Sequence, residues 1–407
     1  MRILIGTFDV AGWLNQFRLD LEAMGHEVTT AVQTRNPFLD FDYDVNLQER
    51  FDRYRLFRTG ISSNLFMRVF NKLQNTIAYH FFGRELSRLI DDHDMVIRLW
   101  SPFLPDSLEN RIIKEKGKKL IVLFVGSDVR NHSTFRQEFD TSRWTFPEAF
   151  IVSSMEQQLK LIRHAEKYAD AVFSVPDQAG LQLRPYHHLQ VPAPIDRCTY
   201  ALHPERKMLK VLHAPSAPYK KGTDIIESTI QRLLDEGMEF EFVSIRDMPQ
   251  EKVLEMLTDA DVLVDEIVFH GPGALSFEAM LSGCAVATRY MEDSPDFYRP
   301  PVWQIDAENI YDRLKHLLGD PVLVRRLAEE GRMYVLDKND SKRIVADFLR
   351  KAENPDEYDY IPRFLTDRYR PTDRSEAALI NKWTRFVKDT DWYAKHVTPK
   401  VREGLEF

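Results

Sequence analysis

The chain has 407 residues, of which 43% are hydrophobic, which is enough for more than one buried core and predicts two or three domains. Its 63 acidic and 55 basic residues give a formal net charge of −8. This mild negative charge argues against a protein whose main partner is nucleic acid, because such a protein would carry an excess of basic residues.

The first half of the chain alternates short β-branched runs with helical stretches, which is the pattern of βαβ units. In chain order, the sequence predicts a strand at 2–7, a helix at 13–24, a strand at 27–32, a long amphipathic helix at 64–90, a strand at 95–99, a helix at 108–116, a strand at 120–125, a helix at 148–168 and a strand at 171–175. The strands are nearly continuous apolar runs, as expected of strands buried on both faces of a parallel sheet.

The pattern breaks at Pro192 and Pro194, which exclude a helix and favour an extended crossing between domains. It then restarts, with strands predicted at 209–213, 240–243, 262–265 and 285–288 and helices at 223–236, 250–257, 275–282 and from 307 onward. We therefore predict an α/β protein of two doubly wound Rossmann-like domains, 1–194 and 195–350, facing each other across a cleft. The remaining segment, 351–407, is predicted to be a helical extension that packs on these domains.

Glycine is scarce, at 16 residues, so a glycine in a turn directly after a strand is informative. Gly12 precedes a predicted helix whose free N–H groups attract anions, although the same turn also fits a plain strand-to-helix connection. Gly126, Ser127 and Asp128 follow the strand at 120–125. Their polar groups either hold a ligand or form a helix cap.

Two lysines and a glycine, Lys220, Lys221 and Gly222, open the first helix of the second predicted domain. Two ammonium groups at a helix start are unfavourable beside the positive end of the helix dipole unless an anion lies near them. Helix amides and lysines together bind phosphate, so the sequence predicts a diphosphate site here.

A Gly-Pro-Gly turn that ends at Gly273 follows the predicted strand at 262–265 and lets the backbone approach a ligand closely. The amides of Ala274 and Leu275 then begin a helix and are free to bind a phosphate. Glu278 lies one turn further along, where a carboxylate can accept the hydroxyl groups of a ribose. We therefore predict that a nucleoside diphosphate binds between the two domains, mainly on the second.

The Lys-Gly pair, Glu-Ala-Met at 278–280 and Leu-Ser-Gly-Cys-Ala-Val at 281–286 resemble the retaining family-4 glycosyltransferases of GT-B fold. The likeness extends to about residue 350 and includes Gly-Ser-Asp-Val-Arg at 126–130 and Pro-Ile-Asp at 194–196. It implies an enzyme that moves a sugar from a nucleoside-diphosphate sugar to an acceptor hydroxyl, with retention and with no metal or other cofactor.

The resemblance also assigns roles by position. Lys221 would contact the leaving diphosphate, with Lys220 or His213 supplying a second positive charge if one is needed. Gly273 and the amides of Ala274 and Leu275 would hold the distal phosphate. Glu278 would hold the ribose, and Gly12 would lie in the loop near the transferred sugar.

Three positions depart from the family pattern. His270 stands at the first glutamate of the family's E-x7-E motif, Pro215 at a usual arginine, and Val125 at a usual histidine. Retaining transfer from a diphosphate relies on electrostatic stabilisation more than on a protein base, so an active enzyme tolerates such changes. We take His270, Lys221 and Asp128 as the candidate catalytic residues.

Two other functions stay open. One is a GT-B sugar-nucleotide epimerase, which needs no separate acceptor. The other is a catalytically silent protein that binds a nucleotide or a sugar, as the three departures suggest. For the transferase, the expected acceptor is a glycan, a lipid-linked compound or a small molecule, and no nucleic acid partner is expected.

Cys198 and Cys284 form no CxxC pair, and neither a signal sequence nor a long apolar run is visible, so we expect a cytoplasmic protein. Residues 51–72 combine bases with aromatic side chains. They either contact anionic lipid peripherally or form a packed helix with solvated arginines. No set of metal ligands is visible, because the acidic segment 91–94 is expected to be the solvated end of a helix.

Overall fold

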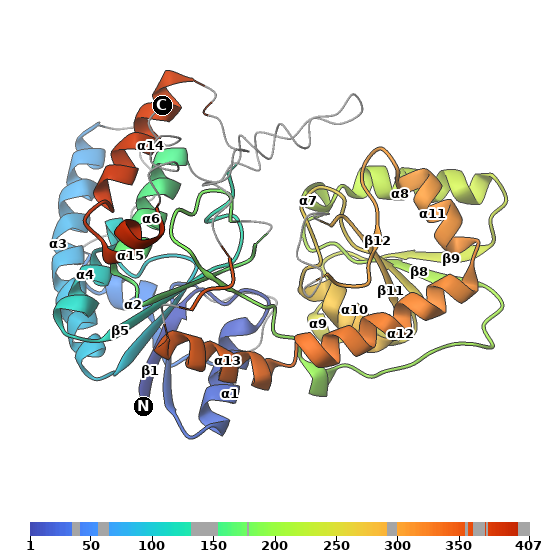
Figure 1. The fold of residues 1–407 in the computed structure, drawn as a ribbon, viewed down its shortest axis with the longest axis horizontal. Helices are drawn as coiled ribbons and strands as arrows, with labels where there is room; N and C mark the ends of the chain where they lie inside the picture. Colours follow the sequence, from blue (N-terminus) through green and yellow to red (C-terminus); the bar gives the residue numbers. More distant parts are fainter. Residues whose placement is uncertain are drawn as a thin grey trace. The chain divides into compact units, whose positions relative to one another are not determined.

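A computed structural model describes residues 1–34, 41–55, 65–131, 154–176, 179–290, 299–354, 357–360, 371 and 373–397 (Figure 1). Of these residues, those within 1–131, 154–189 and 348–397 form one compact unit, called unit 1, and those within 190–347 form a second, called unit 2. The first boundary therefore lies at 189/190 rather than at 194/195. The described part of the predicted C-terminal extension belongs to unit 1.

Unit 1 is built on a parallel seven-stranded sheet with the order β3-β2-β1-β4-β5-β6-β7. Its strands are β1 (Arg2–Thr7), β2 (Glu27–Val32), β3 (Val45–Asn46), β4 (Met95–Leu99), β5 (Lys119–Phe124), β6 (Ala171–Ser174) and β7 (His187–His188). The five longer strands confirm the sequence prediction to within one residue at each end. The edge strands β3 and β7 were not predicted, because a two-residue strand has no apolar run.

Helices cover both faces of the unit 1 sheet (Figure 1). They are α1 (Trp13–Ala23), α2 (Leu47–Asp52), α3 (Leu65–Asp91), the 3-10 turn η1 (Pro105–Ser107), α4 (Leu108–Glu115), α6 (Met155–Tyr168), α13 (Ser341–Glu353), α14 (Arg374–Phe386) and α15 (Asp391–His396). One apolar core joins the sheet to the helices α2, α3, α4 and α6, and α14 and α15 add side chains to it. This burial is the main stabilising contribution to the unit.

The chain returns from unit 2 to unit 1 through α13. Phe348 of α13 packs against Phe17 of α1 and Phe173 of β6, with ring centroids 5.7 Å and 4.6 Å apart. Further on, Tyr360 forms a β-bridge with Tyr186 and stacks on its ring. These contacts explain why the last helices belong to the first unit.

The segment 91–94 is only partly the solvated helix end that was predicted. Asp91 is half exposed and forms an ion pair with Lys116 at 2.6 Å. His93 is buried, with Nδ1 2.7 Å from the Leu89 carbonyl oxygen and Nε2 2.8 Å from Thr29 Oγ1. His93 therefore ties the end of α3 to β2.

Unit 2 is built on a parallel five-stranded sheet with the order β12-β11-β10-β8-β9. Its strands are β8 (Leu209–His213), β9 (Phe240–Ser244), β10 (Val262–Val264), β11 (Ala285–Thr288) and β12 (Trp303–Gln304). Its helices are η3 (Ile195–Arg197), α7 (Pro218–Lys221), α8 (Thr223–Asp235), α9 (Gln250–Thr258), α10 (Ala274–Ser282), α11 (Ile310–Leu318) and α12 (Pro321–Lys338). Figure 1 shows α8 and α11 on one face of this sheet and α9, α10 and α12 on the other.

The strands of unit 2 differ in how deeply they are buried. Strand β9 lies at the edge of the sheet, and its residue Glu241 is exposed. By contrast, the central strands β10 and β11 are buried along their whole length. None of the helices in the described ranges is both long enough and apolar enough to cross a bilayer.

Candidate functional site

The candidate site lies where β8 and β10 run side by side in unit 2. Between these strands the order of the sheet reverses, and doubly wound sheets bind ligands at the carboxyl edge of such a switch point. Lys221 reaches this edge from α7, shortly after β8, and Asp265 and Glu266 directly follow β10. The Lys221 Nζ atom lies 2.7 Å from Asp265 Oδ1 and 3.3 Å from Glu266 Oε1.

The N-terminus of α10 completes this group of charges. Ser276, in its first turn, donates from Oγ to Asp265 Oδ2 at 2.6 Å. No described side chain caps the helix start at Gly273. A Cβ atom built on Gly273 would lie 4.0 Å from Glu266 Oε1, so the Glu266 carboxylate lies beside the helix start. Glu266 therefore lies next to both Lys221 and Gly273.

The ion pair at Lys221 is charged at neutral pH. Burial alone would lower the pKa of Lys221, but the carboxylates of Asp265 and Glu266 outweigh burial and raise it. Burial likewise disfavours the ionised form of Asp265, yet the Lys221 ammonium and the Ser276 hydroxyl hold the pKa of Asp265 below its ordinary value. The site therefore contains one cation and two carboxylates.

This arrangement corrects one step of the sequence argument. The sequence predicts an external anion for two lysines at a helix start. In the structure both lysines lie in the last turn of α7, and for Lys221 the anions are side chains of the same chain. Lys220 is not part of the group, and its Nζ lies 5.7 Å from the centre of the Tyr219 ring. The two neighbouring lysines are thus distinguished by the fold.

His213 does not supply a second positive charge. It is fully buried, with Nδ1 2.7 Å from the Val264 carbonyl oxygen and Nε2 2.9 Å from Thr223 Oγ1. Burial lowers its pKa, so the ring is neutral at pH 7. As a neutral imidazole it donates to the carbonyl and accepts from the hydroxyl, which joins β8, β10 and the start of α8.

Gly222 lies in the left-handed region, with φ 76°, and links α7 to α8. A Cβ atom there would lie 2.5 Å from Ile267 Cγ1, and the Ile267 amide donates to the Lys221 carbonyl at 3.1 Å. The absence of a side chain at Gly222 is therefore needed for the turn after Lys221 to pack against the turn after β10.

We expect Gly222→Ala to lower the midpoint of thermal unfolding more than Gly237→Ala does. Both glycines have positive φ, which costs about 1–2 kcal/mol for alanine, but no atom lies within 4 Å of a Cβ built on Gly237. Overpacking against Ile267 adds about 1–3 kcal/mol for Gly222→Ala alone. Equal losses in the two variants would show that the close approach to Ile267 does not matter.

Glu278 lies one turn inside α10 and is almost completely buried. Burial raises the pKa of its carboxyl to about 7, against the hydrogen bond that Gln250 Nε2 donates to Glu278 Oε1 at 2.6 Å. The negative charge of Asp265 raises the pKa of Glu278 further, so the two carboxyl groups are close enough to interact electrostatically. Gln250 was not singled out from the sequence.

Gly12 and Asp128 lie in unit 1. Gly12 has φ 81° and precedes α1, but the anion at this helix start belongs to the protein itself. Asp9 Oδ1 accepts from the Leu14 amide at 3.1 Å, and Asp9 Oδ2 accepts from the Asn15 amide at 3.3 Å. The predicted attraction of α1 for an anion is therefore met by Asp9.

Asp128 is buried and accepts hydrogen bonds from backbone amides of its own turn. Its Oδ1 lies 2.8 Å from the Gly126 nitrogen and 3.2 Å from the Val125 nitrogen. Burial raises its pKa to about 6 in spite of these bonds. The amides bound by Asp128 precede it in the chain, so these bonds close the turn and do not cap a helix among the described residues. The catalytic role of Asp128 stays a prediction.

The last predicted catalytic residue, His270, is half buried and directly precedes the Gly271–Gly273 turn. The fold also adds three residues to which the sequence analysis assigned no role: Asp265, Glu266 and Ser276. Their signal was present, because Asp265 and Glu266 directly follow a buried strand. Among the described residues, no group of three or more potential metal ligands is close enough together to hold an ion.

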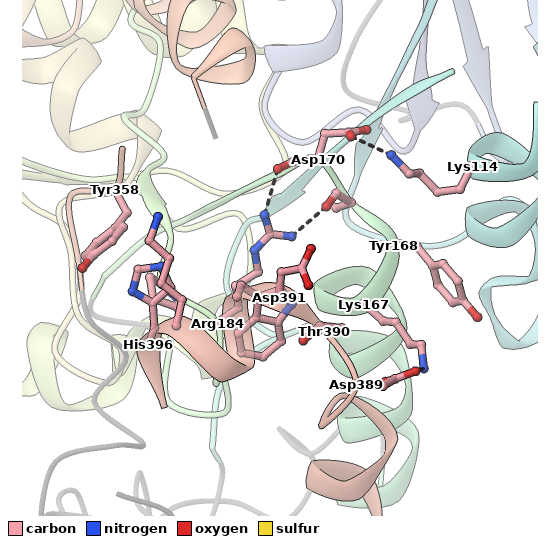
Figure 2. A pocket seen from close by; sticks show the side chains of 14 residues that line it. Lys114, Lys167, Tyr168, Asp170, Arg184, Tyr358, Asp389, Thr390, Asp391 and His396 are labelled. Atoms are coloured by element: carbon pink, nitrogen blue, oxygen red, sulfur yellow. Dashed lines mark hydrogen bonds and ion pairs between the residues drawn. The ribbon is translucent and has the colours of Figure 1, made fainter. Parts of the chain in front are cut away.

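A separate hollow of about 400 Å³ lies in unit 1 (Figure 2). The ion pairs Lys114–Asp170 and Lys167–Asp389 lie on its wall, and Arg184 donates to backbone carbonyl groups there. Asp170 directly precedes β6, and Pro185 lies shortly before β7, so the hollow lies at the amino edge of the sheet, where residues 389–396 complete its lining. Doubly wound folds bind ligands at the opposite edge, and no predicted site residue lines this hollow.

Comparisons with known proteins show the fold. No protein-family model matches the chain, and no curated protein matches it in sequence. Among solved structures, sucrose-phosphate synthase from Thermosynechococcus elongatus is similar at a TM-score of 0.56 and 14% identity, over 87% of this chain and 98% of that one.

An α-glucosyltransferase in complex with UDP-glucose and DNA is similar at a TM-score of 0.56 and 12% identity, over 87% of this chain and 99% of that one. TarM is similar at a TM-score of 0.54 and 10% identity, over 86% of this chain and 98% of that one. With the two parallel sheets described above, these likenesses show that the chain has the GT-B fold, as predicted.

Proposed function

We propose that the chain is a glycosyltransferase of the retaining family-4 type, which moves a sugar from a nucleoside-diphosphate sugar to an acceptor hydroxyl. The observation that carries the proposal is the position of Lys221. Its ammonium lies at the switch point of the unit 2 sheet, beside the uncapped start of α10. A cation and a free helix N-terminus together suit a phosphate group.

The donor in this proposal is a nucleoside diphosphate sugar held by unit 2. The α-glucosyltransferase of the same fold was solved with UDP-glucose, which supports a UDP-linked donor here. Glu266 holds Lys221 through the longer of the two contacts, 3.3 Å, and lies beside Gly273. It is therefore the carboxylate that an incoming phosphate would replace at Lys221, while Asp265 would keep the lysine in position.

In the reaction, the bond between the anomeric carbon and the diphosphate oxygen breaks, and the acceptor oxygen forms the new bond on the same face of the sugar. Negative charge grows on the leaving diphosphate, where Lys221 and the amides of Ala274 and Leu275 would stabilise it. The acceptor proton leaves with the diphosphate. Asp128 and His270 remain candidates for residues near the transferred sugar.

For the acceptor we propose only a chemical class: a glycan, a lipid-linked compound or a small molecule. The structure of the α-glucosyltransferase with a similar fold contains DNA. The net charge of −8 of this chain gives no support for a nucleic acid acceptor. An intracellular location is part of the same proposal. The proposed nucleotide of the donor is UDP, and the transferred sugar is left open.

We expect UDP or a UDP-sugar to raise the midpoint of thermal unfolding, because a ligand at 100 times its dissociation constant adds about 2.7 kcal/mol to the stability of the folded state. With an acceptor panel, the matching donor should yield both free UDP and a glycosylated product. An epimeric UDP-sugar without a glycosylated product would favour an epimerase instead. Stabilisation without turnover across the panel would favour a silent binding protein.

A further inference from the structure

Helix α3 carries a stripe of apolar side chains that stay exposed on the described part of unit 1. Val69, Leu73, Ile77 and Phe81 are 61%, 59%, 48% and 45% exposed. Residues four apart lie on one side of a helix, so these four form a continuous stripe along three turns. Scattered apolar residues are ordinary on protein surfaces, but a contiguous stripe marks an interaction site.

The same helix is also apolar on its inner side, where Ala78, Phe82 and Leu86 are buried in the core of unit 1. Packing of this side against α2 and α4 explains how α3 is held in unit 1. It does not explain why the residues of the stripe are apolar. In Figure 1, α3 lies at the outer flank of unit 1. The helix predicted at 64–90 is present as α3, but it carries apolar side chains on two sides and so is not amphipathic.

The charges around the stripe have one sign. Over residues 65–84 the sequence contains Arg68, Lys72 and Arg84 and no acidic residue. All three bases are exposed. The next acid, Glu85, is paired with Arg50 at 3.0 Å. Lys72 and Arg84 lie three positions after Val69 and Phe81, so the outer side of α3 presents the apolar stripe together with these two positive charges.

We propose that this outer side of α3, with Val69, Leu73, Ile77 and Phe81 as its apolar stripe, binds the surface of an anionic lipid bilayer. Apolar side chains enter the boundary between head groups and acyl chains, while flanking bases contact lipid phosphates. A second copy of the chain is a poor occupant. A symmetric pair would bring the positive charges of both copies into one interface, with no acid of residues 65–84 to compensate them.

This surface overlaps the segment considered at 51–72 at Val69 and Lys72 and extends beyond it to Arg84. Of that segment, residues 56–64 lie outside the described residues. Phe51 is buried against α3, and Tyr54 stacks on Phe81 with centroids 5.8 Å apart. Phe51 and Tyr54 thus support α3, and most of the exposed apolar stripe lies beyond residue 72.

Cosedimentation of the full chain with vesicles tests the proposal. The chain is expected to bind phosphatidylcholine vesicles that contain phosphatidylglycerol at least ~10-fold more tightly than pure phosphatidylcholine vesicles. Raising the salt from about 0.1 M to about 1 M should weaken this binding, because the Debye length falls from about 10 Å to about 3 Å. Vesicle binding that depends neither on lipid charge nor on salt would overturn the proposal, and so would the absence of binding.

The double variant Leu73→Ser with Ile77→Ser should bind anionic vesicles more than ~10-fold less tightly, because it removes two central apolar side chains. Lys72→Glu with Arg84→Glu should also weaken binding. The matched control is Val322→Ser with Met333→Ser on α12 of unit 2, which changes two exposed apolar residues elsewhere. Control variants that lose as much binding would overturn the assignment to α3.

Two further measurements keep these variants interpretable. The thermal unfolding midpoints should match that of the wild type, because Leu73 and Ile77 are about half exposed and contribute little to the core. Sedimentation velocity gives the oligomeric state in solution. A wild-type dimer that the Leu73 and Ile77 variant converts to a monomer, without any vesicle binding, would show that a second copy covers the stripe and would refute a bilayer surface.

Discussion

Replacing Lys221 by alanine is expected to lower kcat by ~10²-fold or more, the scale of losing one preorganised electrostatic contact to a developing charge. Because that charge grows on the diphosphate in the transition state, the loss should be larger in kcat than in donor affinity. The structure adds a second effect. Asp265 and Glu266 would lose their cation while buried, which should cost about 3–5 kcal/mol of stability.

The matched control is Lys220→Ala, since Lys220 lies outside the ion-pair group. It should leave stability unchanged and have a milder effect on turnover. Turnover is measured on protein that circular dichroism shows to be folded, and stability by thermal unfolding. If Lys220→Ala is more damaging to kcat, the register of the resemblance is wrong by one residue. If neither change affects turnover, the diphosphate is held elsewhere.

Glu278→Gln is expected to weaken nucleoside diphosphate binding by about 1.5–3 kcal/mol, which is the usual loss for hydrogen bonds to a charged group. The same change should stabilise the free protein at pH 8. Burial raises the pKa of Glu278 to about 7, so wild-type protein carries a buried, destabilising charge above that pH. Weaker binding with greater stability is a combination that simple misfolding does not produce.

The pH dependence of the protein's stability follows from the raised pKa of Glu278. Between the ordinary value of 4.5 and about 7, the folded state holds a proton on Glu278 that the unfolded state has lost. The contribution of Glu278 to stability therefore falls as the pH rises through this window, by on the order of 3 kcal/mol at most.

Thermal unfolding of wild type and Glu278→Gln from pH 5 to 8 measures this contribution, with Glu329→Gln at an exposed position as control. The stability of the Gln variant should fall less across the window than that of the wild type, and the control should follow the wild type. Parallel curves for wild type and Glu278→Gln would contradict the raised pKa. Unchanged nucleotide affinity would contradict the ribose assignment.

The strands and helices that position the site were predictable because their signals are local. A run such as 120–125 has no polar side chain, so it can only be a buried strand or a buried helix segment, and its short length decides for the strand. The helix starts at Gly12, Gly222 and Gly273 were equally readable, since a glycine follows each strand within a short turn.

The partners of the charged groups were not predictable, because they depend on residues far apart in the chain. Lys221 and Asp265 are 44 positions apart, and only the neighbouring places of β8 and β10 in the sheet bring them to 2.7 Å. A sequence shows that a cation needs an anion, but it does not show whether a ligand or a side chain supplies it. The same holds for α1, where Asp9 caps the helix.

The sequence by itself therefore determined the α/β class, the two βαβ halves and the glycine turns before the helices, because apolar periodicity and glycine positions act within a few residues. The tertiary structure decided that Lys221 is paired within the chain, that the described residues after 347 belong to unit 1, and that α3 exposes one of its two apolar sides. In each case the physical reason is that burial and pairing belong to surfaces, and surfaces form only when distant segments pack together.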